Sequence, residues 1–389
     1  MTMDTKDDIF TTHIGAYLKA NKAQRGKILD HVCFVTGLHR KAAIRSFARL
    51  QGKSHYDRDR RGRPLYYTPD VTLALKQIWE AASEVCGELI HPLIAEYVAI
   101  LQRDDMWQHG EETTAKLLQM SERTVCNRIG ILMSGKHPGR GLSATKPGQL
   151  KEVIPIFTGP WDDKPPGYGQ LDTVVHCGNS LTGNMVFTVN WTDVATLWGG
   201  RQAQWNKGQR ATQSSLSAIR QALPFAMHGA HPDTGSEFIN WHLKDWCDKQ
   251  GIELTRSRPY HKNDNAYVEQ KNGHVIRRFL GYQRFDCQSV VDTMNELYTV
   301  LDLYLNHFVP SRKCIEKLRV GSKYKKSYDT AKTPYQRVLQ HPAVSEQVKQ
   351  RLREEHETMN PLLLKQQVDT LLTRIQRIQR DYDNRVTSQ

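Results

Sequence analysis

An apolar strand pattern that begins near residue 170 most constrains how this 389-residue chain can fold. Leu171, Val174 and Val175 lie within residues 170–176 and have the composition of a buried strand. Further strands are expected at 185–189, from 195 onward and at 252–255, and helices at 214–223 and 237–248. Strands followed by alternating helices and strands predict a mixed α/β domain, which we place at residues 151–310.

The chain before this domain has the periodicity of helices. Residues 25–50 predict two helices joined by a turn at Gly37, a pattern typical of a helix-turn-helix, and residues 113–132 repeat it. We therefore expect all-α helix-turn-helix domains: a DNA-binding domain at 1–55, and a second helical or helix-turn-helix domain with a linker at 56–150. An ordinary packed helix pair is the alternative in both places. The residues expected to face DNA are Arg40, Lys41, Arg45, Arg123, Asn127 and Arg128.

The net charge of +13 is distributed unevenly along the chain. Residues 1–150 carry +6, residues 151–300 carry no net charge, and residues 301–389 carry +7. Basic regions of this kind favour nucleic acid as the partner, with a solvated basic surface as the alternative. No apolar run approaches the ~20 residues that a membrane helix needs, so no membrane partner is expected. The seven cysteines have no Cys-x-x-Cys spacing, which favours a reducing cytoplasm over a disulfide or zinc site.

The last region, residues 311–389, combines a basic segment with helices. The basic residues of its first part are Arg312, Lys313, Lys317, Arg319, Lys323, Lys325, Lys326 and Lys332. We expect a short β-like DNA-binding segment here, with a solvated connector as the alternative. Apolar residues then repeat every 3.5 residues from Leu364 to Ile378, a helix that either packs on its own domain or joins protomers in an oligomer.

Three acidic residues stand out by their setting. Asp172 lies inside the apolar strand pattern, Asp233 follows a predicted strand, and Glu269 lies at the start of a predicted helix. The last two are separated by 35 residues, which alone is weak support because acidic residues are common. Asp233 could be a turn residue and Glu269 could simply favour a helix N-terminus, but a carboxylate in an apolar strand is harder to explain structurally.

The residues around these acids carry a family resemblance. Asp233 lies in the run Asp-Thr-Gly-Ser-Glu-Phe (233–238), and Glu269 ends the run Ser-Arg-Pro-Tyr-His-Lys-Asn-Asp-Asn-Ala-Tyr-Val-Glu (257–269). Both runs resemble motifs of the retroviral-integrase superfamily, and within it of the transposases of bacterial insertion sequences. The resemblance covers about residues 160–310. Thr234 departs from the pattern, in which Asn is usual.

The resemblance implies an RNase H-like integrase catalytic core in which Asp172, Asp233 and Glu269 are catalytic and bind metal. Three clustered carboxylates repel one another by roughly 4 kcal/mol per pair at 4 Å and an effective dielectric constant of 20, so such a cluster persists only if cations neutralise it or a proton binds. Mg²⁺ takes oxygen ligands, and two such ions are suited to in-line displacement at phosphorus. We expect two Mg²⁺ ions, for which Mn²⁺ can substitute, with Asp172 between them. Nearby basic residues expected to contact DNA are Arg258, His261, Lys262, Lys271 and Arg277.

The implied function is that of a DDE transposase, a magnesium-dependent polynucleotidyl transferase and DNA endonuclease. It binds the terminal inverted repeats of a transposon, cleaves DNA by hydrolysis and joins the 3′-OH ends to target DNA. A homodimer or homotetramer on double-stranded DNA in the bacterial cytoplasm, associated with the nucleoid, is expected. A domesticated sequence-specific DNA-binding protein or repressor with an unused core is the alternative. A nuclease acting on RNA hybrids is a third interpretation.

Overall fold

The computed structural model describes residues 3–51, 66–133, 154–157, 161, 164–233, 235, 237–258, 265–320 and 323–388. The chain forms two compact units, residues 1–66 and 67–389. Each unit is described by itself below. None of the helices in these described ranges is both long enough and apolar enough to cross a membrane.

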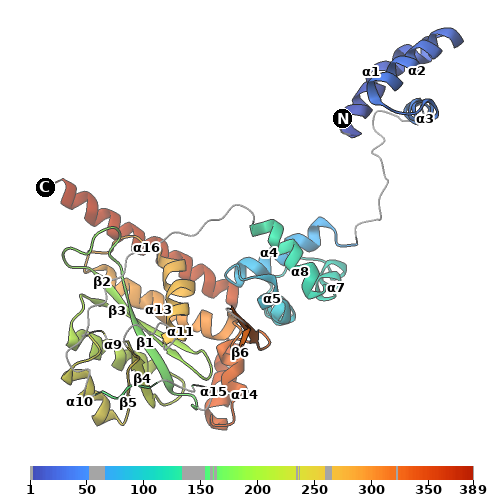
Figure 1. Ribbon diagram of the computed structural model, residues 1–389. Coiled ribbons are helices and arrows are strands. Elements are labelled where there is room, and N and C mark those ends of the chain that lie inside the picture. Colours follow the sequence, from blue (N-terminus) through green and yellow to red (C-terminus); the bar gives the residue numbers. More distant parts are fainter. Residues whose placement is uncertain are drawn as a thin grey trace. The chain divides into compact units, whose positions relative to one another are not determined.

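The first unit is a bundle of three helices. These are α1 (Met3–Lys19), α2 (Lys22–Thr36) and α3 (Arg40–Gln51), drawn in dark blue in Figure 1. Gly37 ends α2 in the left-handed backbone region, with φ of 67°, and so starts the turn into α3. Phe10 from α1 packs edge-on against Phe47 from α3, so both helices bury one face in a shared core. The two helices predicted at residues 25–50 are therefore present, and α1 completes their core.

The second unit is built on a five-stranded mixed sheet. Its strands are β1 (Tyr168–Val175), β2 (Val186–Asp193), β3 (Gly199–Trp205), β4 (Gly229–Pro232) and β5 (Glu253–Leu254), in the order β3-β2-β1-β4-β5. The first three strands pair antiparallel, and β4 and β5 extend the sheet in parallel with β1. The mixed α/β core is confirmed. The third strand begins at Gly199 instead of 195, because Asp193 caps a tight turn by accepting hydrogen bonds from the N–H and Oγ1 of Thr196, both at 2.7 Å.

Both faces of the sheet are covered by helices. Leu171 and Trp191 point into a core with α9 (Gln209–Ala222) and α10 (Trp241–Gln250). On the other face of the sheet, side chains such as those of Val174 and Val186 join a second core with α13 (Val290–Phe308). Figure 1 shows α9 and α10 on the side of the sheet away from α13 and α16. The helix predicted from residue 237 begins only at Trp241, since Asn240 serves as its N-cap and accepts from the Leu243 N–H at 2.9 Å.

The second core extends to helices that precede the sheet in the sequence. They are α4 (Pro69–Ala81), α5 (Gly87–Ile90), η1 (His91–Leu93), α6 (Ile94–Arg103), α7 (Glu111–Leu118) and α8 (Glu122–Met133). Tyr97 of α6 donates its hydroxyl to the carbonyl of Phe308 at 3.1 Å, and Tyr304 of α13 donates to the carbonyl of Ala81 at 2.7 Å. One apolar cluster thus runs from α4 to α13 without a break.

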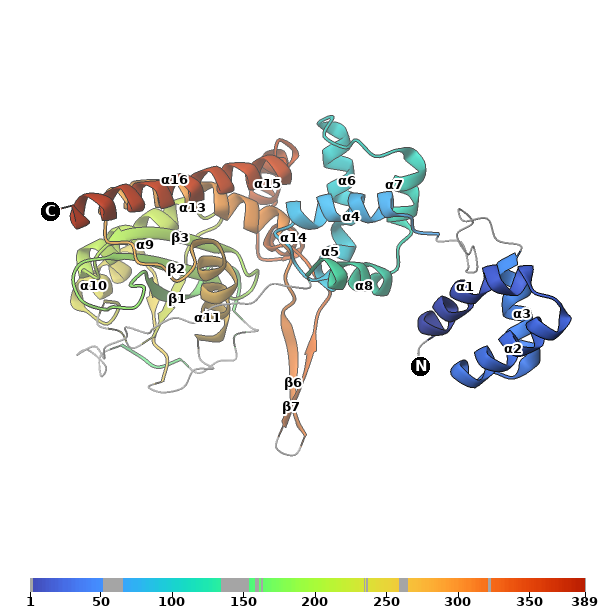
Figure 2. The ribbon, with the colours of Figure 1, turned by 90° about the horizontal axis from the view of Figure 1, so that it is seen from above.

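The chain between the sheet and its end forms the remaining elements. They are α11 (Ala266–Lys271), the π-helical stretch η3 (Asn272–Arg277), α12 (Arg278–Leu280), β6 (Cys314–Val320), β7 (Lys323–Tyr328), α14 (Pro334–Gln340), α15 (Glu346–Glu357) and α16 (Pro361–Thr387). Val368 and Ile375 of α16 are fully buried in the core shared with α13. The apolar repeat of this helix therefore packs on its own domain, which decides between the two alternatives. Figure 2 shows α16 lying along α13, and the β6–β7 hairpin projecting away from the helices.

A glycine in β1 is required by the close approach of a buried ring. A Cβ atom on Gly169 would lie 2.1 Å from Cε2 of Trp191, which is fully buried. Because neither the ring nor the strand has room to move, we expect Gly169→Ala to lower the free energy of unfolding by about 1–3 kcal/mol, measured by urea denaturation. The control is Gly130→Ala in α8, where a Cβ meets nothing within 4 Å and helix propensity predicts a gain of up to about 1 kcal/mol. Equal stability changes in the two variants would contradict this account.

Candidate active site

Asp172 lies on β1 and is held in place by a chain of amides. Its Oδ1 accepts a hydrogen bond from the Thr173 N–H at 2.8 Å, and its Oδ2 accepts from Nδ2 of Asn272 at 2.6 Å. Asn272 in turn accepts from Nδ2 of Asn190, on the neighbouring strand β2, at 2.8 Å. The half-buried carboxylate is therefore fixed from its own strand, from β2 and from the helical segment after Glu269.

Asp233 lies next to Asp172 because of the register of two parallel strands. Leu171 of β1 pairs with Pro232 of β4, so the two acidic residues follow paired positions. Oδ1 of Asp233 accepts from the Gly235 N–H at 2.8 Å. With its amide oriented to satisfy both neighbours, Asn265 accepts from the Asp233 N–H at 3.1 Å and donates to the carbonyl of His231 at 3.2 Å. The loop after β4 is thereby joined to the start of α11.

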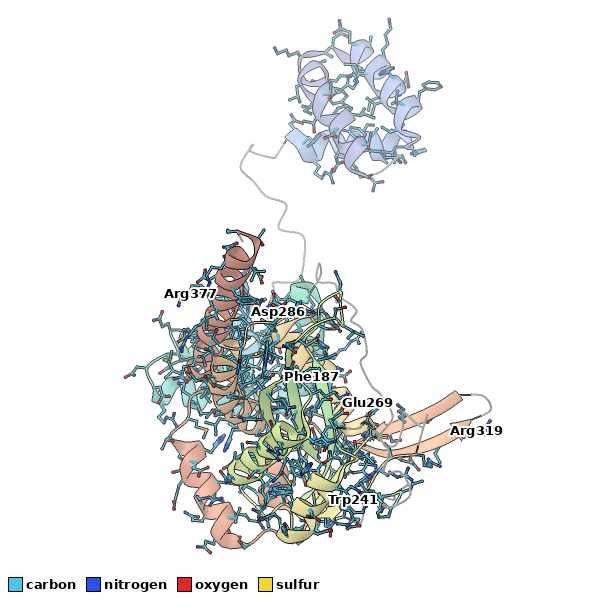
Figure 3. The ribbon with its side chains drawn as sticks, turned by 90° about the vertical axis from the view of Figure 1, so that its left-hand side faces the viewer. Phe187, Trp241, Glu269, Asp286, Arg319 and Arg377 are labelled. Atoms are coloured by element: carbon cyan, nitrogen blue, oxygen red, sulfur yellow. The ribbon has the colours of Figure 1, made fainter. Side chains whose placement is uncertain are left out.

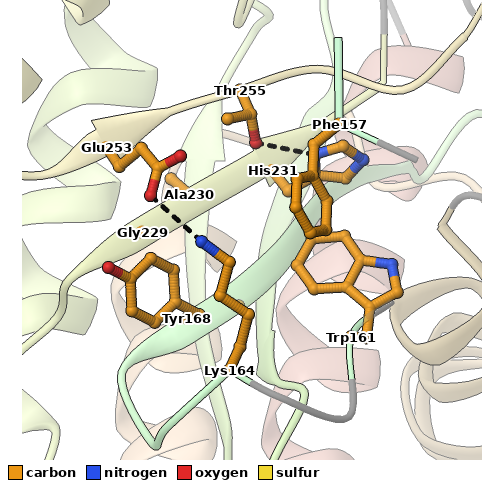
Figure 4. A pocket seen from close by; sticks show the side chains of 10 residues that line it. Phe157, Trp161, Lys164, Tyr168, Gly229, Ala230, His231, Glu253 and Thr255 are labelled. Atoms are coloured by element: carbon orange, nitrogen blue, oxygen red, sulfur yellow. Dashed lines mark hydrogen bonds and ion pairs between the residues drawn. The ribbon is translucent and has the colours of Figure 1, made fainter. Parts of the chain in front are cut away.

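The end of β4 is also fixed on the side away from Asn265. Nδ1 of His231 and Oγ1 of Thr255 are hydrogen-bonded at 2.8 Å, which links β4 to the end of β5. The ring of Trp161 meets the His231 ring edge-on, with centroids 4.8 Å apart. Figure 4 shows these side chains around a small hollow beside β4. This packing orients the backbone that leads into Asp233.

Glu269 is carried by α11, whose first turn is anchored on β1. Oε1 of Gln170 accepts from the backbone N–H groups of Tyr267 at 2.8 Å and Val268 at 3.2 Å, two donors that the helix itself leaves unsatisfied. Gln170 stands two residues before Asp172, so the same strand positions one acid and the helix that bears another. The side chain of Glu269 is exposed at the rim of the site.

The electrostatics of the site show that the three predicted acids lie near one another. Burial first, and then the charge of Asp233, raise the pKa of Asp172 to about 8, with a further contribution from Glu269. Burial likewise raises the pKa of Asp233. Within the described residues, however, no three Asp, Glu, His or Cys side chains stand close enough together to hold a metal ion as they are. The structure thus brings the three carboxylates together without closing them around a common point.

A fourth carboxylate, which the sequence reasoning missed, lies beside Asp233. Glu237 is only 3% exposed, and its Oε1 forms a 2.6 Å ion pair with Nζ of Lys207 and accepts from Oγ1 of Thr173 at 3.0 Å. A Cβ atom on Gly235 would lie 2.5 Å from its Oε2 and 2.9 Å from Oδ1 of Asp233. A side chain at position 235 would therefore collide with the carboxylates of Glu237 and Asp233, and Gly lets both stand close to the backbone there. The signal was present in the sequence, since Glu237 is part of the motif around Asp233.

The residues predicted to contact DNA fall into three groups. Those on exposed positions are Arg40, Lys41, Arg45, Arg123, Asn127 and Arg258, although Arg40 is also paired with Asp30. His261 and Lys262 lie outside the described residues. The third group consists of Arg128, Lys271 and Arg277, whose side chains are half-buried.

Of this third group, Arg128 was expected to face outward, but its side chain is half-buried and hydrogen-bonded within the protein. Arg128 donates to Thr72 and, at 2.8 Å, to the carbonyl of Tyr67. Arg277 donates to the carbonyl of Val175 at 2.7 Å, and so ties η3 to the end of β1. Burial, with Arg201 and Arg337 nearby, lowers the pKa of Lys271 to about 7. Helical periodicity predicted an outward side chain for Arg128, whereas Thr72 and Tyr67 bind it. DNA contacts by Arg128, Lys271 and Arg277 stay predictions.

The raised pKa of Asp172 predicts a pH dependence of stability. The folded-state pKa of about 8 lies above the ordinary value of 3.8, so protonated Asp172 contributes to the free energy of unfolding. This contribution is fully present below pH 3.8 and is lost as the pH rises toward 8. Without divalent cations, we expect Asp172→Asn to become progressively more stable than the unmodified protein between pH 4 and 8. Urea denaturation at several pH values measures this difference, and a constant difference across the range would contradict the assignment.

The ion pair between Lys207 and Glu237 predicts a coupling that a double-mutant cycle measures. Lys207→Met leaves a buried carboxylate without its cation, and the expected loss is on the order of 3 kcal/mol in the free energy of unfolding. Adding Glu237→Gln removes the unpaired charge and recovers most of this loss. Lys207→Arg, which keeps the charge, is the control. Additive effects of the Met and Gln substitutions would show that the pair is not coupled.

Comparison with known proteins gives similarities to viral proteins and one extensive match to a bacterial protein. No family model matches the chain. The Pro-Pol polyprotein of simian foamy virus type 1 is 31% identical over 68 residues, which are 17% of this chain and 6% of the polyprotein. Among solved structures, the catalytic core domain of BIV integrase aligns over 44% of this chain and 91% of that domain, with 16% identity. The TM-score of this alignment is 0.29, which is too low to carry an argument.

The most extensive of these similarities is to a bacterial protein. The uncharacterized protein y4rM of Sinorhizobium fredii is 34% identical over 338 residues, which make up 87% of this chain and 96% of that protein. The match therefore includes most of both proteins and extends well beyond the segment that carries the three acids. This chain belongs to the same protein family as y4rM of Sinorhizobium fredii.

Proposed function

We propose that this protein is a DDE transposase with an RNase H-like catalytic core, which cleaves DNA at transposon ends and joins the 3′-OH ends to target DNA. The observation that carries the proposal is the convergence of Asp172, Asp233 and Glu269 beside the paired strands β1 and β4, where burial and the charges of the other two acids raise the pKa of Asp172. The motifs around the last two acids and the short similarity to a retroviral Pro-Pol polyprotein support the same assignment.

The donor atoms of the site fit a divalent cation such as Mg²⁺. All three side chains offer carboxylate oxygens, the ligands that this ion prefers, and their mutual repulsion is relieved when a cation binds. Asp172, Asp233 and Glu269 would hold the metal. When bound, it would supply activation of a water or 3′-OH nucleophile and stabilisation of the leaving oxygen.

The protein's own residues prepare this site by fixing the acids in place. Asn272 and the Thr173 N–H direct the oxygens of Asp172, and Asn265 links the backbone of Asp233 to α11. Lys207 compensates the charge of Glu237, so that the buried fourth carboxylate adds less negative charge beside Asp233. Glu269 at the exposed rim leaves one side of the site open to a large substrate such as DNA.

Recognition of the DNA ends belongs to the helices before the core in this proposal. Lys41 and Arg45 are exposed on α3, and Arg123 and Asn127 are exposed on α8, each the second helix of a helix pair. Such positions suit a helix that enters the major groove. Since two transposon ends must be joined together, the active form would be a homodimer or homotetramer on DNA.

A strand-transfer assay tests the catalytic assignment. Labelled duplexes that carry the ends of the element are incubated with the protein and Mg²⁺ or Mn²⁺, and products are resolved on a denaturing gel. We expect Asp172→Asn, Asp233→Asn and Glu269→Gln each to reduce cleavage and joining by at least about 10³-fold, because each removes a charge that the reaction requires.

Matched controls use acidic residues away from the site. Asp245→Asn and Glu253→Gln change exposed carboxylates on α10 and β5, and both are expected to retain activity. Full activity in any of the three triad variants would refute the assignment. Binding to the ends without metal-dependent cleavage by the unmodified protein would favour a DNA-binding repressor instead.

A further inference from the structure

We propose that the hairpin formed by β6 and β7 is a DNA-binding arm, which holds duplex DNA by its phosphates beside the three acids. This inference rests on the proposed function for the identity of the DNA, and it assigns the contact to one element of the fold. The hairpin was anticipated as a basic β-like segment in the sequence. Its form, its attachment and its place beside α11 come from the structure.

The charge of the hairpin is strongly one-sided. Its two strands carry Lys317, Arg319, Lys323, Lys325 and Lys326, and one acidic residue, Glu316. The register pairs the backbone of Lys317 with that of Lys326. Within the part of the chain that the structure describes, Lys325 and Lys326 are exposed and have no hydrogen-bond or ion-pair partner. A polyanion that binds along the arm would supply partners for these exposed cations.

Three apolar side chains that the structure describes on the hairpin are exposed instead of packed. Ile315, Leu318 and Tyr328 are 62%, 51% and 52% exposed. A two-stranded hairpin without a packed face is marginal in water. Exposed apolar groups next to lysines therefore indicate a surface that is covered when a partner binds.

The root of the hairpin, in contrast, is firmly attached. Asp329 accepts the Lys313 N–H at 2.6 Å and a hydrogen bond from Arg337 of α14 at 2.5 Å, and this ion pair is largely buried. Arg312 pairs with Glu88 of α5 at 2.6 Å. The arm therefore starts from a fixed base, which gives its cations a defined direction relative to the core.

That base lies directly beside the helix that carries Glu269. Nζ of Lys313 stands 6.0 Å from the centroid of the Tyr267 ring, and Tyr267 precedes Glu269 by two residues on α11. Figure 3 shows Glu269 on the side of the core from which the hairpin extends, with Arg319 toward its far end. DNA bound along the arm would thus continue past the exposed rim of the acid site.

Duplex DNA fits the arm better than other polyanions do. A two-stranded ribbon has the width that the major groove of B-DNA admits, and strands of six and seven residues reach about 20 Å. Binding to single strands depends on stacking with aromatic side chains. The two strands carry two tyrosines, Tyr324 and Tyr328, against five lysines and arginines, so contacts to phosphates predominate. Phosphate contacts from such residues position a duplex without reading its sequence.

The test compares two charge-matched triple variants of the full-length protein. Arg319→Gln, Lys325→Gln and Lys326→Gln neutralise the arm, and Arg377→Gln, Arg380→Gln and Arg385→Gln neutralise an equal charge on the exposed face of α16. Binding to a fluorescein-labelled 30-base-pair duplex is followed by anisotropy at several NaCl concentrations. Divalent cations are left out, so that no cleavage interferes and catalysis plays no part in the result.

The arm variant is expected to bind at least about 10-fold more weakly at 0.1 M NaCl. The slope of the logarithm of its association constant against the logarithm of the NaCl concentration is expected to fall in magnitude by up to about 2.7, which is about 0.9 for each lost phosphate contact. The α16 variant is expected to change neither quantity appreciably. Unchanged thermal melting shows that the exposed substitutions leave the fold intact. Charge reversal by Arg319→Glu with Lys326→Glu is expected to weaken binding further.

Equal binding by the arm variant and the α16 variant would overturn the proposal. Equal dependence on the arm for single-stranded DNA, RNA or phosphatidylserine vesicles would overturn the commitment to duplex DNA. These results are independent of the triad, because a protein with an inactive triad and a functional arm still binds the duplex. Conversely, loss of the arm alone leaves the metal-dependent assay of the acids interpretable at high protein concentration.

Discussion

Burial of acidic side chains close to one another, beside β1 and β4, is the constraint on which this structure depends. The parallel register of the two strands places Asp172 and Asp233 in adjacent positions, and Glu237 brings a further buried carboxylate next to them. Burial first, and then the charge of Asp233, raise the pKa of Asp172, so this arrangement destabilises the fold when Asp172 is ionised. It persists because hydrogen bonds and one lysine hold the carboxylates in place, and because burial on both faces of the sheet supplies the stability that the site loses.

Neutral amides do most of this positioning. Gln170, Asn265 and Asn272 connect β1, the end of β4 and the segment of α11 and η3 to one another. An amide donates to a carboxylate without adding a fixed positive charge that would compete with a bound cation. The π-helical stretch of η3 begins at Asn272, and such stretches are common at functional sites because they change which residues of a helix face inward. Glu237, in contrast, is paired with a lysine, Lys207, and accepts a hydrogen bond from Thr173, the neighbour of Asp172.

The sequence predicted the mixed α/β core well, because alternating apolar residues depend on local pattern. The three acids chosen from their motifs lie near one another in the structure, and their catalytic role stays a prediction. Strand ends were less predictable. Leu197 and Trp198 are buried apolar residues and have the pattern of a strand, but they belong to a turn that Asp193 caps, so β3 starts later than expected. The hydrogen bond of Arg277 to a backbone carbonyl on β1, about 100 residues away, is not revealed by any local pattern. The pairing of Lys207 with Glu237 also joins separate segments, although Glu237 itself is part of the motif around Asp233.

The hydroxyl groups of Tyr97 and Tyr304 have a consequence for how the protein can be divided. They join α4–α6 to α13 through backbone carbonyls inside a single apolar cluster, so the helices between residues 67 and 133 do not have a complete core of their own. A truncation that begins the chain at the sheet would expose the α13 side of that cluster to water and invite aggregation. A cut near Tyr66 instead leaves two intact interiors. In evolutionary terms, the first three helices can be exchanged as a unit, whereas the next five must change together with the core.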